Sequence, residues 1–272
     1  HLTLISDRLY LASQSVSFWT MSQLSKEKIY FNKADAQGKV GEFPKQYQRI
    51  YPELTVEGSF YDLQSRFNLN NLSDKGYYSF FLHLLDNTTP GLTPKEQINL
   101  TFAIHQWITP YTPGSGNDDL INYYLQQTPP YYPSQALMQS ISELRLIQGV
   151  NAKRYRLLEK YVTALPEITP LNLNTASPIL LTGLGNGLNE GEVKELLAAR
   201  TKKGIKKDSI NALLERLKIR NEQVTLVSEY FMSVAIVKSN DLKLINFTII
   251  KRHKDKEGHL SVRIIRESLN AL

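Results

Sequence analysis

The sequence predicts an α+β fold in which strands at the two ends of the chain enclose a helical block. The first 24 residues contain no Gly or Pro and place apolar residues at helical spacing. Residues 73–224 keep helical spacing between Pro and Gly residues, and after Thr225 the chain becomes rich in Val, Ile and Phe. Because a short strand pair is not stable alone, we expect residues 1–72 and 225–272 to complete one helix-plus-sheet domain. Residues 73–224 would then form an inserted helical domain.

The N-terminal helix is expected to span residues 2–24, and its apolar residues fall on two sides. One line recurs in steps of three and four, and a second lies roughly opposite it at 3.6 residues per turn. A lone surface helix needs only one apolar side. Either the helix is enclosed within its own domain, or one side meets the helix of another protein. The candidate contact residues are Leu4, Leu11 and Phe18 on one side and Ile5, Leu9 and Val16 on the other.

The remaining elements follow in order along the chain. Short strand-like runs occupy residues 29–31 and 54–63, and the polar residues 32–48 are expected to form a loop. Helical spacing is found at 77–85, 94–108, 140–148, 152–165, 178–184, 190–200 and 209–217. Strands are expected at 230–239, 243–251 and 260–266, with a hairpin turn at 254–258.

Composition narrows the class of protein. The 272 residues are 42% hydrophobic, which is enough for a substantial core. The net charge of +6 permits an acidic partner without requiring one. The absence of cysteine excludes disulfides, thiolate metal sites and a cysteine nucleophile. The chain has no apolar run long enough to span a bilayer, and it begins with His1 rather than Met, so we expect a further segment upstream.

Leucine and asparagine alternate in two phrases, residues 66–72 (RFNLNNL) and 169–178 (TPLNLNTASP). Asparagine side chains bond to nearby backbone groups and stabilise turns, so both phrases are expected to fix the chain where a strand is followed by a helix. Ser177 is expected to accept hydrogen bonds from the first amides of a helix that begins with Pro178. These phrases predict architecture rather than chemistry.

Four phrases taken together resemble one protein family. They are residues 60–72 (FYDLQSRFNLNNL), 142–150 (SELRLIQGV), 171–176 (LNLNTA) and 228–231 (SEYF), and their order and spacing are similar to those of the minor pseudopilin K family of type II secretion systems. The resemblance covers nearly the whole chain. It implies a pilin-like N-terminal helix packed on an antiparallel sheet, with a large all-helical domain inserted into the sheet domain.

The same resemblance implies a structural role rather than an enzymatic one. It implies a subunit at the tip of the periplasmic pseudopilus that assembles with the minor pseudopilins I and J and whose bulk prevents another subunit from adding above it. It further implies an apolar segment upstream that anchors the precursor in the inner membrane. Exposed loops of the helical domain would then be the place to contact secreted cargo or the outer-membrane channel.

Members of this family are associated with bound calcium, which prefers oxygen ligands. The acidic phrase at residues 114–119 ends in Asp118 and Asp119, and Glu143 follows downstream as a further oxygen donor. The resemblance therefore implies these three carboxylates as candidate calcium ligands. Residues 107–113 (WITPYTP) contain no carboxylate where the family has an acidic stretch. The alternative is that Asp118 or Asp119 simply caps the next helix.

The sequence offers weaker support for two other functions. Residues 165–200 resemble a helix-hairpin-helix, a motif of several DNA-binding proteins, but Glu190, Glu192 and Glu195 after the hairpin would repel phosphate. The basic residues 202–207 keep this alternative open. The five histidines lie in unrelated contexts with no hydrolase motif nearby, so no enzyme is predicted.

Overall fold

The computed structural model describes residues 2–27, 31–49, 51–114, 118–200, 204–240 and 242–270, apart from the side chains of residues 2–4 and 209. Several sequence predictions fall outside this part. They are the side chain of Leu4, most of the strand predicted at 29–31, residues 115–117 of the acidic phrase, and Lys202 and Lys203 of the basic stretch.

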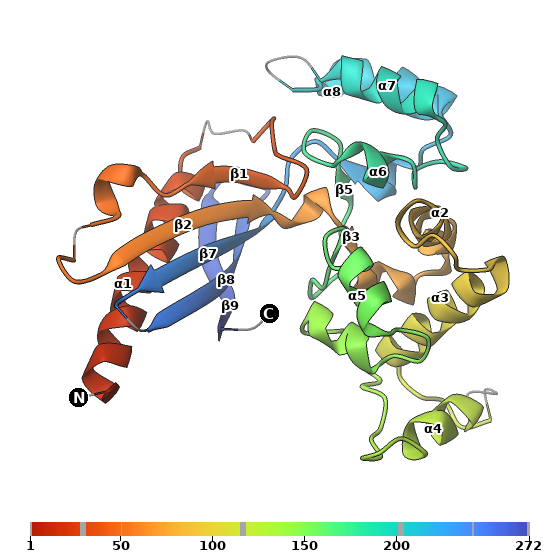
Figure 1. The fold of residues 1–272 in the computed structure, drawn as a ribbon. Helices are drawn as coiled ribbons and strands as arrows, with labels where there is room; N and C mark the ends of the chain where they lie inside the picture. The colour runs from red at the N-terminus through yellow and green to blue at the C-terminus, as the bar shows by residue number, and fades with distance from the viewer. Residues whose placement is uncertain are drawn as a thin grey trace.

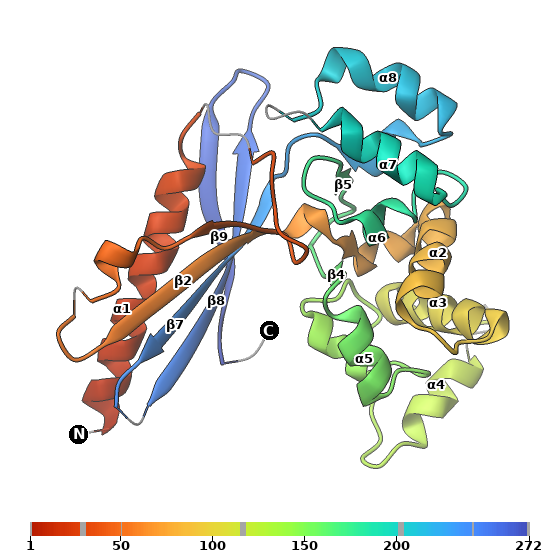
Figure 2. The ribbon, with the colours of Figure 1, turned by 45° about the horizontal axis from the view of Figure 1, so that its top comes forward.

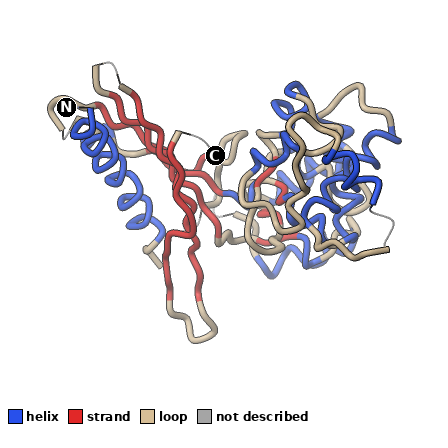
Figure 3. The backbone as a smooth tube through the Cα atoms, turned by 90° about the horizontal axis from the view of Figure 1, so that it is seen from below, coloured by secondary structure: helices blue, strands red, loops and turns tan. Residues whose placement is uncertain are grey.

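One long helix lies on one face of a five-stranded antiparallel sheet (Figures 1 and 3). The helix α1 (Leu2–Leu24) has the predicted bounds. The strands are ordered β1-β2-β7-β8-β9. Their bounds are β1 (Lys39–Glu42), β2 (Thr55–Asp62), β7 (Tyr230–Lys238), β8 (Lys243–Lys254) and β9 (Leu260–Leu269). The predicted α+β class is confirmed.

The centre of the sheet joins two segments that are far apart in the sequence. Strand β2 pairs with β7 from Thr55 opposite Lys238 to Asp62 opposite Phe231. The chain between them leaves the sheet after Asp62 and returns at Tyr230, and it forms a helical part beside one end of the sheet (Figure 2). Its helices are α2 (Tyr78–Thr88), α3 (Pro94–Ile108), α4 (Asp118–Leu125), α5 (Ala152–Leu158), α6 (Pro178–Leu181), α7 (Glu190–Ala199) and α8 (Lys207–Arg216).

The largest cluster of buried apolar side chains lies wholly within this helical part, between Phe67 and Ile219. A second cluster lies between α1 and the sheet. A third joins the two parts, with Leu63 and Leu165 packed against the sheet residues Tyr230, Met232 and Ile249. Phe67, Leu69 and Leu72 belong to the helical part's core, although the predicted domain boundary follows residue 72. The division into two domains stays a prediction.

Four two-residue strands hold the helical part together, and local pattern did not predict them. The helix predicted at 152–165 is wrong in its second half, because α5 ends at Leu158. Strand β4 (Val162–Thr163) instead pairs in parallel with β3 (Phe67–Asn68). In the same way β5 (Leu171–Asn172) pairs with β6 (Val224–Thr225). These strands depend on partners a hundred or fifty residues away, which a local pattern cannot show.

Two smaller predictions are also corrected. Residues 32–48 are not only loop, because β1 pairs with β2 there. Gly41 makes this possible, since a Cβ at that position would lie 2.0 Å from the ring of Phe60. The segment at 140–148 forms a 3₁₀ helix, Ile141–Leu146, rather than an α-helix. Within the described residues, no helix has the length and apolar character needed to cross a membrane.

Candidate functional site

One side of α1 packs on the chain's own sheet. Leu9 is 3% exposed and Val16 is fully buried, and both contact apolar side chains of β2 and β7. Polar contacts beside them fix the position of the helix. The Ser17 hydroxyl lies 3.0 Å from that of Thr248, and the Thr20 hydroxyl donates to Ser233 Oγ at 3.2 Å. This side of α1 therefore makes its apolar and polar contacts within the same chain.

Helix and sheet approach unusually closely at Gly58 in β2. A Cβ added there would lie 2.4 Å from Val16 Cγ1, which is closer than side-chain carbons come, and 3.0 Å from the Cβ of Phe43. Glycine at this position is thus what lets α1 lie flat on the sheet.

The opposite side of α1 faces away from the sheet. Leu11 and Phe18 are each 62% exposed, and Tyr10 beside them is also exposed. Seven residues separate Leu11 and Phe18, which is about two helical turns, so the two side chains lie in line. The two-sided helix predicted from the sequence is present at the described residues.

The candidate contact residues on α1 therefore divide into two groups. Leu9 and Val16 are covered by the chain's own sheet, and Ile5 packs against the same cluster, so a partner could not reach Leu9 or Val16 without unfolding the domain. The sequence left open which side packs on the chain's own sheet, and burial assigns Leu9 and Val16 to that side. Leu11 and Phe18 stay candidates, while the side chain of Leu4 lies outside the described part.

The two leucine–asparagine phrases meet at the junction of sheet and helical part. Asn68 Oδ1 accepts from the amides of Asn70 and Leu165, at 3.1 and 3.0 Å. The Asn71 side chain forms a pair of hydrogen bonds with the backbone of Thr169, at 2.8 and 2.9 Å. These buried amides satisfy backbone groups that no helix or sheet ladder could reach. The two phrases therefore have the architectural role expected from the sequence.

A buried carboxylate lies at the centre of this junction. Asp62 ends β2 and is fully buried. Its Oδ2 accepts hydrogen bonds from Asn172 Nδ2 at 3.1 Å, the Thr175 hydroxyl at 2.5 Å and the Ser228 hydroxyl at 2.7 Å. Its Oδ1 accepts from the Gln64 amide at 2.8 Å. Burial raises the pKa of the Asp62 carboxyl, because the loss of hydration outweighs these four hydrogen bonds.

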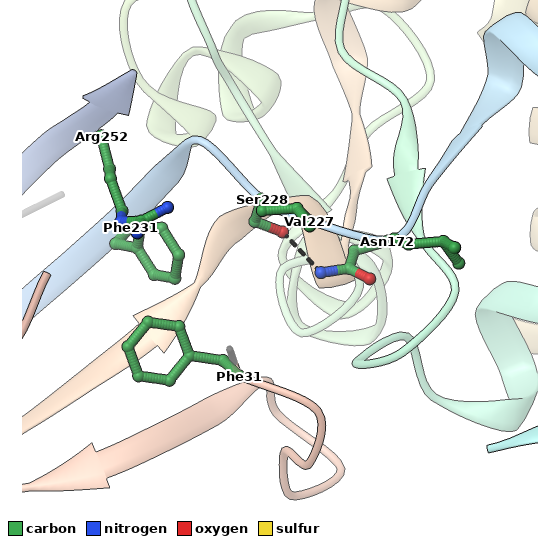
Figure 4. Close-up of a pocket in the computed structure, with 7 residues that line it drawn as sticks. Phe31, Asn172, Val227, Ser228, Phe231 and Arg252 are labelled. Carbon is green, nitrogen blue, oxygen red and sulfur yellow. Dashed lines mark hydrogen bonds between the residues drawn. The ribbon is translucent and has the colours of Figure 1, made fainter. Parts of the chain in front are cut away.

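Figure 4 shows the neighbouring cavity at the same junction. Asn172 and Ser228 point toward one another, with Asn172 Nδ2 donating to Ser228 Oγ at 2.8 Å. Phe31 and Phe231 lie together on one side of this pair, with ring centroids 5.3 Å apart. The cavity measures about 10 Å³, room for about one water molecule. It is a packing gap rather than a ligand site.

One sequence prediction at the junction is wrong. Ser177 precedes the first residue of α6, and Pro178 takes the first helical position as expected. The Ser177 side chain, however, accepts no hydrogen bond from the helix, and its buried hydroxyl has no partner among the described residues. A helix of only four residues is held by packing rather than by its cap.

The three candidate calcium ligands do not come together as a group. Glu143 accepts from the Gln139 amide at 2.7 Å and from Trp107 Nε1 at 2.9 Å, and it closes a capping box with Ser140. Asp118 and Asp119 lie exposed in the first turn of α4, where Asp118 accepts from the Tyr111 hydroxyl at 2.5 Å. Both carboxylates thus lie inside the first turn of α4, where a negative charge is favourable, and the capping alternative stays a prediction.

Among the described residues, a different acidic group lies close enough together to share a cation. Asp255, Glu257 and His259 are exposed at the β8–β9 turn. Asp255 Oδ1 accepts from the amides of Glu257 and His259 at 3.0 and 2.8 Å. Sequence reasoning identified this segment as a turn, and turn formation accounts for the arrangement.

The hairpin of the helix-hairpin-helix segment packs against another helix of the same chain. Gly187 in its hairpin packs against the imidazole of His83 in α2, so closely that a Cβ there would lie 2.6 Å from the ring. Asn189 caps α7 in a capping box with Glu192, whose carboxylate accepts from the Asn189 amide, and Glu190 pairs with Lys194. The hairpin thus serves as a packing element and presents carboxylates where a phosphate would have to bind.

Comparison with known proteins is consistent with this architecture. A sequence model described as "Type II secretion system (T2SS), protein K" matches residues 65–167. Type II secretion system protein K of Aeromonas hydrophila is 30% identical over 229 residues, covering 74% of this chain and 68% of that protein. The chain belongs to the type II secretion system protein K family. Its counterpart in Pseudomonas aeruginosa is 29% identical over 211 residues, and the alignment spans 74% of this chain but only 62% of that protein.

The fold of this protein K family member is also found in a solved structure. A chain of the GspK-GspI-GspJ complex from the type 2 secretion system of enterotoxigenic Escherichia coli matches with a TM-score of 0.71. The match covers 99% of this chain and 98% of that one at 20% sequence identity. The helix, the sheet and the helical part therefore recur together at low sequence identity.

Proposed function

We propose that this chain is a non-enzymatic structural subunit, a minor pseudopilin at the tip of the type II secretion pseudopilus that assembles with the minor pseudopilins I and J. The observation that carries the proposal is the outward side of α1, where Leu11 and Phe18 are exposed in line along the helix. Membership of the protein K family supports it. The matching Escherichia coli chain comes from a complex with GspI and GspJ.

Physical chemistry favours a helix partner for this side. Burying a leucine or phenylalanine side chain contributes roughly 1.5–3 kcal/mol. Two such residues aligned on a rigid helix match the ridges and grooves of a second helix. The sheet behind α1 holds it in place, so little ordering cost remains to be met on assembly.

The helical part supplies bulk beside the sheet. We propose residues 1–72 and 225–272 as the pilin-like domain and residues 73–224 as the inserted domain, whose width stops a further subunit from adding above it. Secreted cargo and the outer-membrane channel are the proposed contacts of its exposed surface. Before assembly, the subunit would stand in the periplasm, anchored in the inner membrane by a segment upstream of His1. Asp118, Asp119 and Glu143 remain the proposed oxygen donors for calcium, and Glu143 would have to leave Trp107 and Gln139 to join the two aspartates.

Copurification with the I and J proteins of the same secretion system tests the proposal. We expect a stoichiometric complex by size-exclusion chromatography and light scattering. The double variant Leu11→Ser/Phe18→Ser should weaken assembly by at least 100-fold, because about 3 kcal/mol of apolar burial is lost.

A matched control is Tyr132→Ser, which removes a side chain that is 69% exposed on the helical part. It should leave assembly unchanged, and both variants should melt within a few degrees of the parent chain. If the α1 variant assembles as well as the parent chain, the outward side of α1 is not the contact.

A further inference from the structure

Strand β9 is the last strand of the sheet. One of its edges pairs with β8, and no strand lies along the other edge in the part of the chain that the structure describes. An open edge of this kind is a template for pairing with another chain, and proteins usually shorten or cover it. Here it is ten residues long.

The half of β9 nearer the hairpin turn is regular. Leu260 to Ile264 pair one to one with Lys254 to Ile250, and the register shifts only beyond Ile264. The pairing of β7 with β8 already stops at Lys251, so the hairpin projects beyond the rest of the sheet (Figure 3). The tip of the hairpin therefore lies beyond the pairing of β7 with β8, while Val262 packs against the apolar cluster that includes Leu24 at the C-terminal end of α1.

The backbone groups that point outward can be assigned from the register. The Arg252 amide donates to Glu229 O on the β7 side at 2.7 Å, so the neighbouring residues of β8 direct their backbone groups toward β9. Their partners in β9 are Arg263 and Ser261, which face β8. The intervening Val262 and Ile264 must then direct their amide and carbonyl groups toward the open edge.

The side chains on this edge alternate in character. Val262 and Ile264 lie opposite Arg252 and Ile250, on the face that carries α1, and Ile264 is 39% exposed. Arg263 lies on the other face, directly opposite Lys251. Lys251 contacts Glu167, whereas Arg263 is exposed and forms no ion pair with the described part of the chain. An apolar face and an unneutralised cation thus alternate along the open edge.

We propose that the β9 edge from Leu260 to Ile264 binds an extended segment of another protein, in which apolar and acidic residues alternate, as an added β-strand. Backbone hydrogen bonds to Val262 and Ile264 would supply the pairing. Apolar side chains of the added strand would extend the face of Val262 and Ile264. Its acidic side chains would lie beside Arg263, where opposite charges on adjacent strands stabilise the pair and like charges destabilise it.

The probe is a capped seven-residue peptide that alternates valine and glutamate and carries a fluorophore, titrated with the purified chain and followed by anisotropy. We expect saturable binding, weakened at least tenfold by Arg263→Glu and by replacing glutamate with lysine in the peptide. Val262→Pro should abolish binding, because it removes an outward amide while leaving the β8 ladder intact. Val262→Thr keeps the amide and should bind like the parent chain.

Two further measurements keep the result independent of folding and of α1. N-methylation of alternate peptide residues removes backbone donors from one edge of the probe without touching the protein, and one of the two alternately methylated peptides should lose binding. Leu11→Ser/Phe18→Ser should not change peptide binding, which separates this edge from the proposed assembly contact. No binding up to about 1 mM peptide, or binding indifferent to Arg263→Glu and to both methylated peptides, would overturn the proposal.

Discussion

At the scale of single residues, Asp62 shows how one buried charge fixes two parts of the chain relative to each other. Its carboxylate accepts from Thr175 in the helical part and from Ser228 at the return to the sheet. Nothing in the local sequence predicts this role, because a single aspartate at the end of a strand has the same local pattern whether it is exposed or buried. Apart from the nearby Gln64 amide, the donors that surround it come from residues more than a hundred positions away.

We predict that Asp62→Asn destabilises the chain, because an amide cannot accept at both oxygen positions, and that the size of the effect depends on pH. The pKa of Asp62 is raised above its ordinary value of 3.8. The folded chain therefore holds this proton at pH values where the unfolded chain has lost it, so the stability that the native side chain provides is greatest below 3.8 and falls as pH rises through the folded pKa. The measurement is the urea midpoint of both chains at several pH values.

The difference in unfolding free energy between the native chain and Asp62→Asn should shrink as pH rises. Asp62→Ala serves as the reference, since it leaves four donors without an acceptor and should cost about 3 kcal/mol or more across the range. A difference that grows with pH would show that the hydrogen bonds, not burial, control this carboxyl.

Calcium binding is a second prediction at the residue scale. If Asp118, Asp119 and Glu143 donate oxygen to calcium, the melting temperature should rise with calcium and fall with a chelator, since a ligand that binds only the folded state stabilises it. Asp118→Asn/Asp119→Asn should remove the shift. The matched control is Asp255→Asn/Glu257→Gln in the exposed turn, which should show the same calcium-dependent shift as the parent chain. A chelator that leaves the midpoint unchanged would refute the site.

At the scale of elements, the sequence predicted the elements whose signals are local and missed those that depend on distant residues. The predicted bounds of α1 and α3 are confirmed, because both helices carry their own signals. Helix α3 has Pro94 at its first position and a capping box between Thr93 and Glu96. That Leu11 and Phe18 lie opposite Leu9 and Val16 also followed from helical geometry, whereas the sequence left open which of the two sides faces away from the sheet. Strands β3 to β6 were missed, because each exists only through a distant partner.

The close approach of α1 and β2 leads to a prediction at this scale. Gly58→Ala should destabilise the chain by about 2 kcal/mol, because the added methyl would lie 2.4 Å from Val16 Cγ1 and the helix must move away. Val16→Ala alone should cost a similar amount by leaving a cavity. In the double variant the new methyl fills the space that the valine leaves.

The three variants should therefore be strongly non-additive in chemical unfolding. The double variant is expected to be at least about 1 kcal/mol more stable than the sum of the single effects, a coupling typical of residues in contact. Leu24→Ala, which is buried elsewhere on α1, provides the matched pair with Gly58→Ala and should be additive. Additivity in both cycles would mean that α1 is not held at Gly58.

At the scale of the whole molecule, two parts with separate cores are joined by a small polar and apolar contact. The helical part's apolar cluster contains no residue of α1 or of the five-stranded sheet. Beyond Asp62, the contact includes Glu167, which accepts from the Tyr230 hydroxyl and from Lys251 at 2.5 Å each. The pKa of Glu167 is lowered by these two hydrogen bonds. These contacts hold the helical part in position on the sheet, although the helical part has a core of its own.

Independent folding of the helical part is the prediction that follows. A fragment of residues 63–229 contains the complete apolar cluster and both leucine–asparagine phrases, and it should show a single cooperative thermal transition by circular dichroism. A fragment of residues 73–224, cut at the boundaries that the sequence suggests, lacks the buried Phe67, Leu69 and Leu72. Each lost side chain removes about 2–5 kcal/mol, and the three together are comparable to the whole stability of an ordinary domain. The shorter fragment should therefore bind a hydrophobic dye and melt without cooperativity. If the two fragments behave alike, the leucine–asparagine phrase at residues 66–72 belongs to the sheet domain. The helical part would then depend on its own helices more than on the sheet.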